Sequence, residues 1–214
     1  ESLGFRVKIL NRKCCGRPMI SKGLLDDAKT NALTNVELLY KYVKKGVKII
    51  GCESSCIMAI RDEYPDLLKG NQMAKEVSQN TFLIQQIISS TAGDGLQQIK
   101  WTKRKLDIML HVHCHERALL GTEAALNTLN YPAGYEAKLI DAGCCGMAGS
   151  FGFEKEHYDI SMTIGEDRLF PAIRSAAQDV VVAVTGVSCK QQVEDGTSRK
   201  AKYFSEVLSD ALED

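Results

Sequence analysis

Five short apolar runs divide the chain, and each is followed within a few residues by a glycine or a cysteine. They are the runs 5–10, 47–50, 106–112, 135–140 and 180–184. Because strands buried on both faces are apolar along most of their length, these runs predict β-strands. Apolar residues at helical spacing predict helices at about 22–45, 65–92, 116–129, 154–170 and 204–212, with a break or kink at Pro171. The alternation of strands and helices predicts an α/β fold with mostly parallel sheets.

Two cysteine turns reveal an internal repeat, a feature best identified before a fold is assigned. Cys14-Cys15-Gly16 recurs as Cys144-Cys145-Gly146, and the apolar run before each turn recurs in the same register of 130 residues. In the second copy a strand, Cys114 and a helix come before Gly134, whereas only three residues come before the matching Gly4. We therefore expect two pseudo-repeated βα units, the first truncated at its N-terminus. The expected boundaries are 1–92 for the first unit, 93–105 for a linker and 106–214 for the second unit.

The charge is balanced, with 27 Lys and Arg against 27 Asp and Glu, so there is no electrostatic reason to expect nucleic acid as a partner. No apolar run approaches the roughly 20 residues that span a bilayer, so no transmembrane segment is expected. The eight cysteines fall at the ends of apolar runs, and two pairs are consecutive. Consecutive cysteines are poorly placed for disulfides, so ligation in a reducing compartment fits better. We expect a cytoplasmic location, or one at the inner face of a membrane reached through partners.

Four cysteines of the second unit are the leading candidate site: Cys114, Cys144, Cys145 and Cys189. Each lies where a predicted strand runs into a loop, and such strand ends can meet at one edge of a parallel sheet. Four thiolates gathered there suit an iron–sulfur cluster or a closed tetrahedral zinc site. The consecutive pair favours the cluster, because zinc sites more often use Cys-x-x-Cys. For any single cysteine, a buried structural role is the alternative.

The first unit offers a smaller set of candidate ligands. Cys14, Cys15 and Cys56 occupy corresponding positions, and Cys52, four residues before Cys56, is a candidate fourth ligand. One metal centre in the second unit is therefore the main expectation, and a second centre in the first unit is the weaker one.

Three histidines crowd Cys114. If the strand continues past residue 112, His111, His113 and His115 share one face and Cys114 faces the other. His113 and His115 are candidates for the layer around the ligands, where His115 is suited to hydrogen-bond a sulfide, pass a proton or replace a ligand. A polar residue filling a loop end is the alternative for all three, and most strongly for His111. Gly146 is also a candidate, because a glycine lets the backbone N–H approach a sulfur.

These motifs resemble the cysteine-rich CCG domain, whose pattern is a lone cysteine, then Cys-Cys-Gly, then a closing cysteine segment. That domain occurs in the cysteine-rich subunit of heterodisulfide reductase and in the iron–sulfur subunits of glycolate oxidase and anaerobic glycerol-3-phosphate dehydrogenase. Four stretches are similar in more detail to the C-terminal iron–sulfur region of fused FAD-binding 2-hydroxyacid dehydrogenases. They are Cys14-Cys15-Gly16-Arg17-Pro18, Arg61-Asp62-Glu63-Tyr64-Pro65, His113-Cys114-His115 and the stretch from Cys144 to Gly152.

The resemblance implies the electron-transfer module of an oxidoreductase. A flavin-binding dehydrogenase domain, in the same chain or a partner subunit, would oxidise a 2-hydroxy acid such as D-lactate with FAD. Electrons would then pass through a [4Fe-4S] cluster toward a quinone or another redox protein.

One departure concerns Gly186, which stands where the family's Cys-x-x-Cys would place a partner for Cys189. The alternatives are a zinc-stapled docking domain without redox activity and, more weakly, thiol exchange, for which no Cys-x-x-Cys is present.

Overall fold

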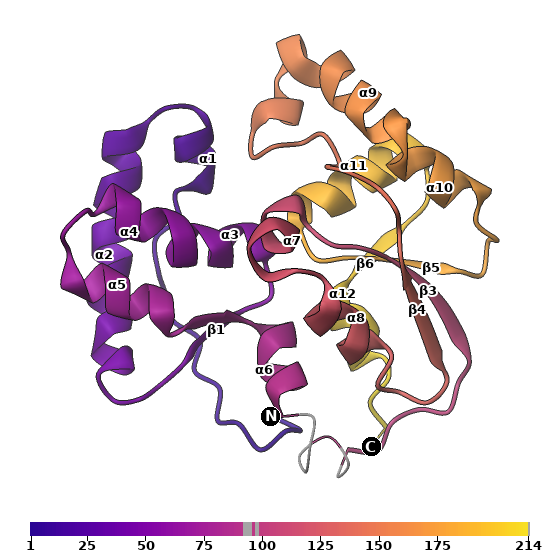
Figure 1. The fold of residues 1–214 in the computed structure, drawn as a ribbon, viewed down its shortest axis with the longest axis horizontal. Coiled ribbons are helices and arrows are strands. Elements are labelled where there is room, and N and C mark those ends of the chain that lie inside the picture. The colour runs from indigo at the N-terminus through magenta and orange to yellow at the C-terminus, as the bar shows by residue number, and fades with distance from the viewer. Residues whose placement is uncertain (92–95, 97–98, 214) are drawn as a thin grey trace.

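The computed structural model describes residues 1–91, 96 and 99–213, which form two α/β units side by side (Figure 1). The first unit contains α1 (Arg17–Ser21), α2 (Leu25–Val43), β1 (Ile49–Gly51), α3 (Ser54–Met58), a π-helical turn (Ala59–Glu63), α4 (Tyr64–Leu67), α5 (Gln72–Gln79), β2 (Thr81–Leu83) and α6 (Ile84–Ser90). The second unit begins with β3 (Leu106–His111), α7 (Cys114–Leu120), α8 (Glu123–Leu129) and β4 (Tyr135–Leu139). It continues with 3-10 turns (Phe151–Phe153, Lys155–His157), α9 (Tyr158–Asp167), α10 (Leu169–Ser175), β5 (Val181–Val184), α11 (Val187–Thr197), β6 (Ala201–Tyr203) and α12 (Phe204–Ser209).

Both sheets are parallel, which confirms the predicted α/β class. Among the described residues, the second unit has four strands in the order β4-β3-β5-β6, and Ile108 of β3 lies opposite Ala137 and Val181. The first unit pairs β1 with β2, with Ile49 opposite Thr81. Because the strands of a parallel sheet all run the same way, their carboxyl ends meet at one edge, where ligands bind in such folds.

Alternate residues of the central strands face opposite layers of the second unit. Ile108 and Leu110 of β3 pack in the cluster that contains residues of α8 and α12. Val182 and Val184 of β5 pack on the other face with residues of α10 and α11, and Figure 1 shows the helices on both sides of this sheet. Burial of both faces explains why these strands are apolar.

In the first unit, Asn35 of α2 fixes the first cysteine turn. The oxygen of this fully buried amide accepts the Lys13 N–H at 2.9 Å, and its nitrogen donates to the Cys14 carbonyl oxygen at 3.2 Å. It also donates to the Tyr64 hydroxyl at 2.9 Å. Because a buried amide without partners costs free energy, these bonds couple the cysteine turn to the core between α2 and α5.

The structure corrects several predicted elements of the first unit. The run 5–10 is not a strand, since no strand in the described part of the chain pairs with it. The segment 65–92 is divided among α4, α5, β2 and α6, and Gly70 adopts left-handed backbone between the first two. The predicted helix at 22–45 begins only at Leu25, after the short helix α1.

Corrections in the second unit have local causes as well. The predicted helix 116–129 is two helices, α7 and α8, separated by Gly121 with φ 77°. The helix predicted at 154–170 divides at Arg168 rather than at Pro171. Pro171 lies in the first turn of α10, where its missing N–H has no intrahelical partner to lose. Strands β2 and β6 were not predicted, because three residues carry no clear periodic signal.

Part of the predicted linker packs against the second unit. Leu96 is buried, and the Trp101 indole N–H donates to its carbonyl oxygen at 3.2 Å. Both residues contact the core cluster that includes Phe204. The linker residues 93–95, 97 and 98 lie outside the described residues.

The two units end in the same way, as expected for a repeat. The Gln86 side chain of α6 accepts the N–H of Leu83 at 3.0 Å, and the Glu206 side chain of α12 accepts the N–H of Tyr203 at 2.7 Å. The segment β1 to α6 therefore corresponds to the segment β5 to α12.

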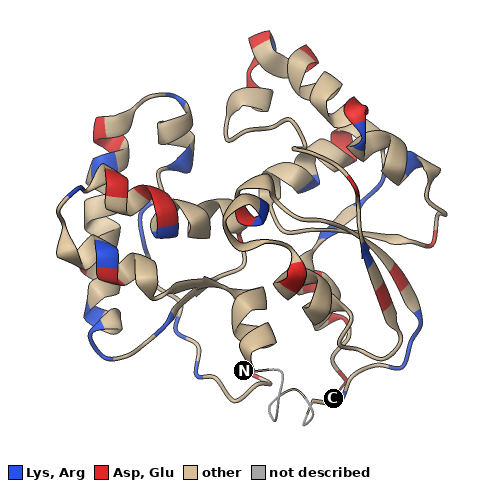
Figure 2. Ribbon diagram, in the orientation of Figure 1, with Lys and Arg blue, Asp and Glu red and all other residues tan. Residues whose placement is uncertain are grey.

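Charged residues are distributed over both units without a large patch of one sign on the ribbon (Figure 2). No helix in the described ranges is both long enough and apolar enough to cross a membrane.

Candidate metal centre

Four cysteines of the second unit converge at the carboxyl edge of its sheet. Cys114 opens α7 after β3, Cys144 and Cys145 follow β4, and Cys189 lies in the first turn of α11 after β5. The Sγ atoms of Cys114 and Cys144 are 3.7 Å apart. Cys145 and Cys189 are buried, and their Sγ atoms lie within 4.8 Å of each other and of a ring nitrogen of His111.

The four thiols interact in pairs, and in each pair one thiol is favoured as the thiolate while its partner keeps its proton. The hydrogen bond with Cys114 is the main cause that holds the pKa of Cys144 far below its usual range, and the same bond raises the pKa of Cys114. The bond with Cys145 similarly lowers the pKa of the buried Cys189 thiol. A bound cation stabilises negative sulfur further, so it would favour the thiolate form at all four positions.

The structure corrects the predicted placement of the histidines. Strand β3 ends at His111 and α7 begins at Cys114, so the alternation of a strand does not continue through this segment. His111, the histidine with the least support from the sequence, lies beside Cys145 and Cys189. Its side chain is buried, and a hydrogen bond with the imidazole helps to lower the pKa of the Cys189 thiol. The sequence signal that could have identified His111 is its position at the end of a strand, three residues before Cys114.

His113 occupies space that a side chain at position 186 would need. A Cβ atom built on Gly186 would lie 2.6 Å from the His113 ring carbon Cδ2. The ring's Nδ1 accepts the N–H of His115 at 3.2 Å, and the His113 N–H donates to the Thr185 hydroxyl oxygen at 2.9 Å. Burial lowers the pKa of His113, so its imidazole is mainly neutral at pH 7. The imidazole ring thus fills the space that a side chain at position 186 would occupy.

The glycine after the cysteine pair is required by both backbone and space. Gly146 has φ 101°, and a Cβ atom there would overlap the Ser161 carbonyl oxygen. Its N–H donates to Cys144 Sγ at 3.4 Å. Gly16 of the first turn also has positive φ, at 86°. Both cysteine turns therefore use a glycine in the left-handed backbone region.

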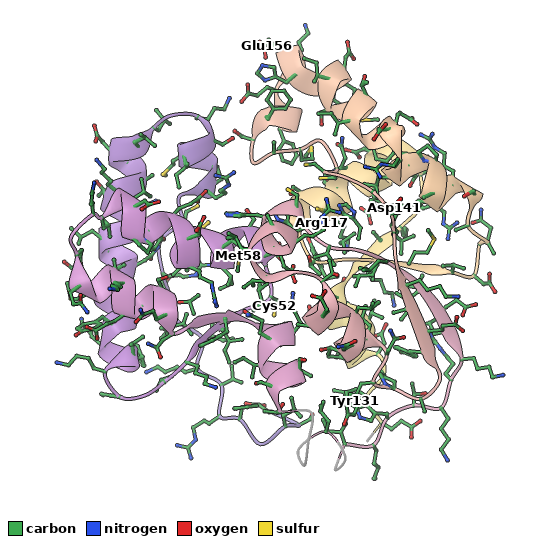
Figure 3. All side chains as sticks on the ribbon, viewed as in Figure 1. Cys52, Met58, Arg117, Tyr131, Asp141 and Glu156 are labelled. Atoms are coloured by element: carbon green, nitrogen blue, oxygen red, sulfur yellow. The ribbon has the colours of Figure 1, made fainter. Side chains whose placement is uncertain are left out.

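In the first unit, the structure brings together two of the four candidate cysteines. The Sγ atoms of Cys15 and Cys56 are 3.3 Å apart, whereas Cys14 is exposed. Cys52 is also exposed, and its thiol hydrogen-bonds with Ser205 of α12 rather than with the Cys15–Cys56 pair. Figure 3 shows Cys52 at the boundary between the two units.

The Cys15–Cys56 pair resembles the thiol pairs of the second unit electrostatically. The bond with Cys15 lowers the pKa of Cys56 to about 6, and the Arg12 guanidinium acts in the same direction. Arg17, which follows the cysteine pair and Gly16, forms an ion pair with Glu63 at 2.5 Å.

Polar contacts join the two cysteine sites across the boundary between the units. Glu53, on the first unit, accepts the N–H of Val187 at 2.8 Å. Burial raises the pKa of Glu53 to about 7, and negative charge on Cys56 and on Cys189 adds to this effect. The carboxylate therefore lies close to both sites. A second contact joins the units at Ser54, whose Oγ is 2.6 Å from a carboxylate oxygen of Glu116.

The donor set of the second site fits a metal centre. Sulfur ligands come from three strand ends, and a buried imidazole lies beside two of them. A buried ring nitrogen within 4.8 Å of two thiol sulfurs is in position to serve as a further ligand. Thiolates with imidazole suit zinc and iron–sulfur clusters.

Residues 108–194, which carry all four of these cysteines, match the family model of the cysteine-rich domain CCG. The second unit is a CCG domain. The resemblance inferred from the cysteine turns is thereby confirmed.

Curated relatives extend this similarity through the first unit. The chain is 34% identical over 214 residues, 99% of its length, to a subunit of the anaerobic glycerol-3-phosphate dehydrogenase of Escherichia coli (strain K12), and this match covers 53% of that relative. It is 27% identical over 195 residues, 90% of its length, to D-2-hydroxyglutarate dehydrogenase of Haemophilus influenzae, covering 19% of that relative. It is 23% identical over 211 residues, 93% of its length, to lactate utilization protein A 2 of Bacillus cereus (strain Q1), covering 83%. The chain thus spans about half the length of the first relative and a fifth of the second.

Proposed function

We propose that this chain is an electron-transfer module in which Cys114, Cys144, Cys145 and Cys189 bind a [4Fe-4S] cluster. The observation that carries the proposal is the meeting of four cysteine sulfurs from three strand ends at one sheet edge. Cysteine thiolates are the usual protein ligands of such clusters, which supply one-electron transfer when bound. The Gly146 N–H, directed at Cys144 Sγ, would stabilise negative charge on the sulfur.

A second cluster, held by Cys14, Cys15 and Cys56 with Cys52 as a further candidate, is the weaker part of the proposal. The close approach of Cys15 to Cys56 supports it. The exposed position of Cys52 beside Ser205 supports a partial site rather than a complete one. Glu53, which lies near both Cys56 and Cys189, would keep two such centres close to each other.

The relatives support a dehydrogenase as the assembly in which the module works. We infer that an FAD domain, in the same chain or a partner subunit, oxidises a 2-hydroxy acid such as D-lactate. Electrons would leave toward a quinone or another redox protein. The relatives named for D-2-hydroxyglutarate and for lactate utilization support this substrate class. The relative with 34% identity is named for glycerol 3-phosphate. An assay of the assembled dehydrogenase should therefore compare the oxidation of glycerol 3-phosphate with that of D-lactate.

One distance favours a second candidate, a zinc-stapled docking domain. The Sγ atoms of Cys114 and Cys144 are 3.7 Å apart. Zinc–sulfur bonds of about 2.3 Å in a tetrahedron place two sulfurs about 3.8 Å apart. A zinc ion would supply structural stability without electron transfer.

Metal analysis of protein purified without oxygen separates the two candidates. We expect brown protein with equal amounts of iron and acid-labile sulfide, and loss of the second-unit cluster in Cys145→Ser. Met147→Leu is the matched control, because Met147 is buried in the same turn and is not a ligand candidate. Cys56→Ser should remove only a cluster of the first unit. Colourless protein with stoichiometric zinc, or a Cys145→Ser variant that keeps the full iron content, would falsify the cluster proposal.

A further inference from the structure

Two cysteines of the first unit, Cys15 and Cys56, point directly at each other. The Cys15 thiol donates a hydrogen bond to the Cys56 sulfur, with 3.3 Å between the two Sγ atoms. A disulfide joins sulfurs about 2.05 Å apart, so these two need to approach by only about 1.2 Å to form one. Asn35 holds the turn that carries Cys15, and Glu53 caps α3, which carries Cys56, by accepting the Ser55 N–H at 3.2 Å. Both backbones therefore present the thiols to each other in fixed positions.

The surroundings of this pair differ from those of the second-unit site in the number of donors. At the second site, a ring nitrogen of His111 and the sulfurs of Cys145 and Cys189 all lie within 4.8 Å of one another. Among the residues that the structure describes, no third cysteine, histidine or carboxylate donor lies within the same distance of both Cys15 and Cys56. A closed zinc site and a [4Fe-4S] cluster each need more donors than two sulfurs. Two sulfurs are, however, the complete set for a disulfide.

The two thiols also differ in exposure. Cys56 is partly exposed, whereas Cys15 is buried, with an exposed fraction of 2%. Redox-sensing cysteines are typically accessible to solvent and lie next to a second cysteine that resolves the oxidised sulfur. Cys56 therefore suits the position that meets an oxidant first, and Cys15 suits the position of the resolving thiol.

We propose that Cys15 and Cys56 form a reversible dithiol–disulfide couple when no metal is bound to the first unit. With a hydroperoxide as the oxidant, the Cys56 sulfur takes one oxygen atom from hydrogen peroxide and becomes a sulfenic acid, and one water is released. The Cys15 thiol then attacks that sulfur, the S–S bond forms, and the oxygen leaves as a second water. A small dithiol reverses the step by thiol–disulfide exchange, in which it gives up two electrons and two protons and becomes a disulfide itself. In reducing compartments such bonds are transient and serve redox sensing.

This couple goes beyond the electron-transfer function proposed above, because none of the four second-unit cysteines takes part in it. A cluster in the first unit would use the same two sulfurs, so a disulfide and a first-unit cluster exclude each other. The first unit thus holds either a metal or a redox-active thiol pair, and the absence of a third donor near both sulfurs in the described part of the chain favours the pair.

Closure of the pair has a direct route to the second site through α3. Cys56 lies in α3, and the N-cap residue Glu53 accepts the Val187 N–H at 2.8 Å. The next residue, Ser54, is buried, and its Oγ lies 2.7 Å from a backbone carbonyl oxygen of the second unit. Val187 is two residues from Cys189. A shift of α3 on oxidation therefore reaches the segment that leads into the second-unit ligands.

Disulfide mapping of the metal-free protein by mass spectrometry tests the proposal. After treatment with one equivalent of hydrogen peroxide, we expect a peptide pair linked through Cys15 and Cys56, and two free thiols again after dithiothreitol. Cys56→Ser should abolish the link. Cys52→Ser is the matched control, because Cys52 is an exposed cysteine four residues away, and this variant should keep the link. Absence of the link in the oxidised wild type, or a link from either residue to a different cysteine, overturns the proposal, as does a metal that stays bound to both sulfurs after chelation.

Hydrogen exchange gives a second readout, at the contact between the units. We expect oxidation to change the exchange rate of the Val187 N–H several-fold in the wild type and to leave it unchanged in Cys56→Ser. The Ala183 N–H is the internal control, because its strand is paired on both sides. An unchanged rate at Val187 in the oxidised wild type overturns the route through α3. Iron and sulfide analysis of the same preparations before metal removal reports separately on the second-unit cluster, so a failure of the cluster proposal is distinguishable from a failure of the thiol couple.

Discussion

Glu53 of the first unit and Val187 of the second are joined by a hydrogen bond, with 2.8 Å between the carboxylate oxygen and the backbone nitrogen. Val187 is the first residue of α11, and Cys189 follows two residues later. The carboxylate therefore lies at a helix N-terminus, where negative charge is favoured, while burial and nearby thiolates oppose that charge. This contact ties the geometry of one cysteine site to that of the other.

The first prediction concerns the pH dependence of stability in the metal-free protein. The pKa of Glu53 rises from its usual value of 4.5 to about 7 on folding, so the folded state holds this proton more tightly than the unfolded state. The stabilisation that results is complete below about pH 4.5 and is lost as the pH rises through about 7.

We expect Glu53→Gln to flatten this dependence and to raise the free energy of unfolding at pH 8 by about 1–3 kcal/mol. Urea unfolding at pH 5 and pH 8 measures the effect. Glu37→Gln, an exposed site, is the control, and identical profiles for Glu53→Gln and the wild type contradict the prediction.

The second prediction concerns the turn after the second cysteine pair. Gly146→Ala should lower the free energy of unfolding by about 2 kcal/mol or more, because a side chain at φ 101° is strained and collides with the Ser161 carbonyl. Gly143→Ala is a matched control three residues away, since a Cβ atom there meets nothing within 4 Å. Chemical denaturation of the metal-free variants compares the two. Equal losses at both positions would show that the Gly146 backbone is not constrained as described.

A third prediction tests whether His113 and Gly186 depend on each other. Gly186→Ala should cost about 1–3 kcal/mol in the free energy of unfolding, because its Cβ atom overlaps the His113 ring. In a His113→Ala background the same substitution should cost much less, since the ring that it displaces is gone. A double-mutant cycle by urea unfolding gives the coupling energy directly. A coupling energy near zero would mean that the ring does not hold the space at position 186.

The fourth prediction concerns His111 as a ligand in addition to the cysteines. His111→Gln should lower the bound metal per folded protein or change the electron paramagnetic resonance spectrum of the reduced protein, because a donor nitrogen beside Cys145 and Cys189 is removed. His157→Gln is the control, since His157 stacks on Phe151 with ring centroids 4.1 Å apart and lies outside the site. If His111→Gln retains both the full metal content and an unchanged spectrum, the imidazole is structural only.

Much of the architecture could be predicted from the sequence, because its signals are local. The runs that became β3, β4 and β5 are apolar for the physical reason that both faces of these strands are buried. The helix breaks at Gly70 and Gly121 depend on a backbone conformation that only the folded context selects, so helical spacing alone overestimated helix lengths. Short strands such as β2 exist because a neighbour pairs with them, and a run of three residues does not indicate that neighbour.

The sequence by itself determined the repeat, the parallel α/β class and the cysteines at strand ends, since each depends on residue type and spacing along the chain. Only the tertiary structure decided which donors meet. His111 joined the cysteines because its strand stops there, and Cys52 pairs with Ser205 because α12 lies beside it. Contacts between residues far apart in the chain depend on packing, and packing has no period that a single sequence displays.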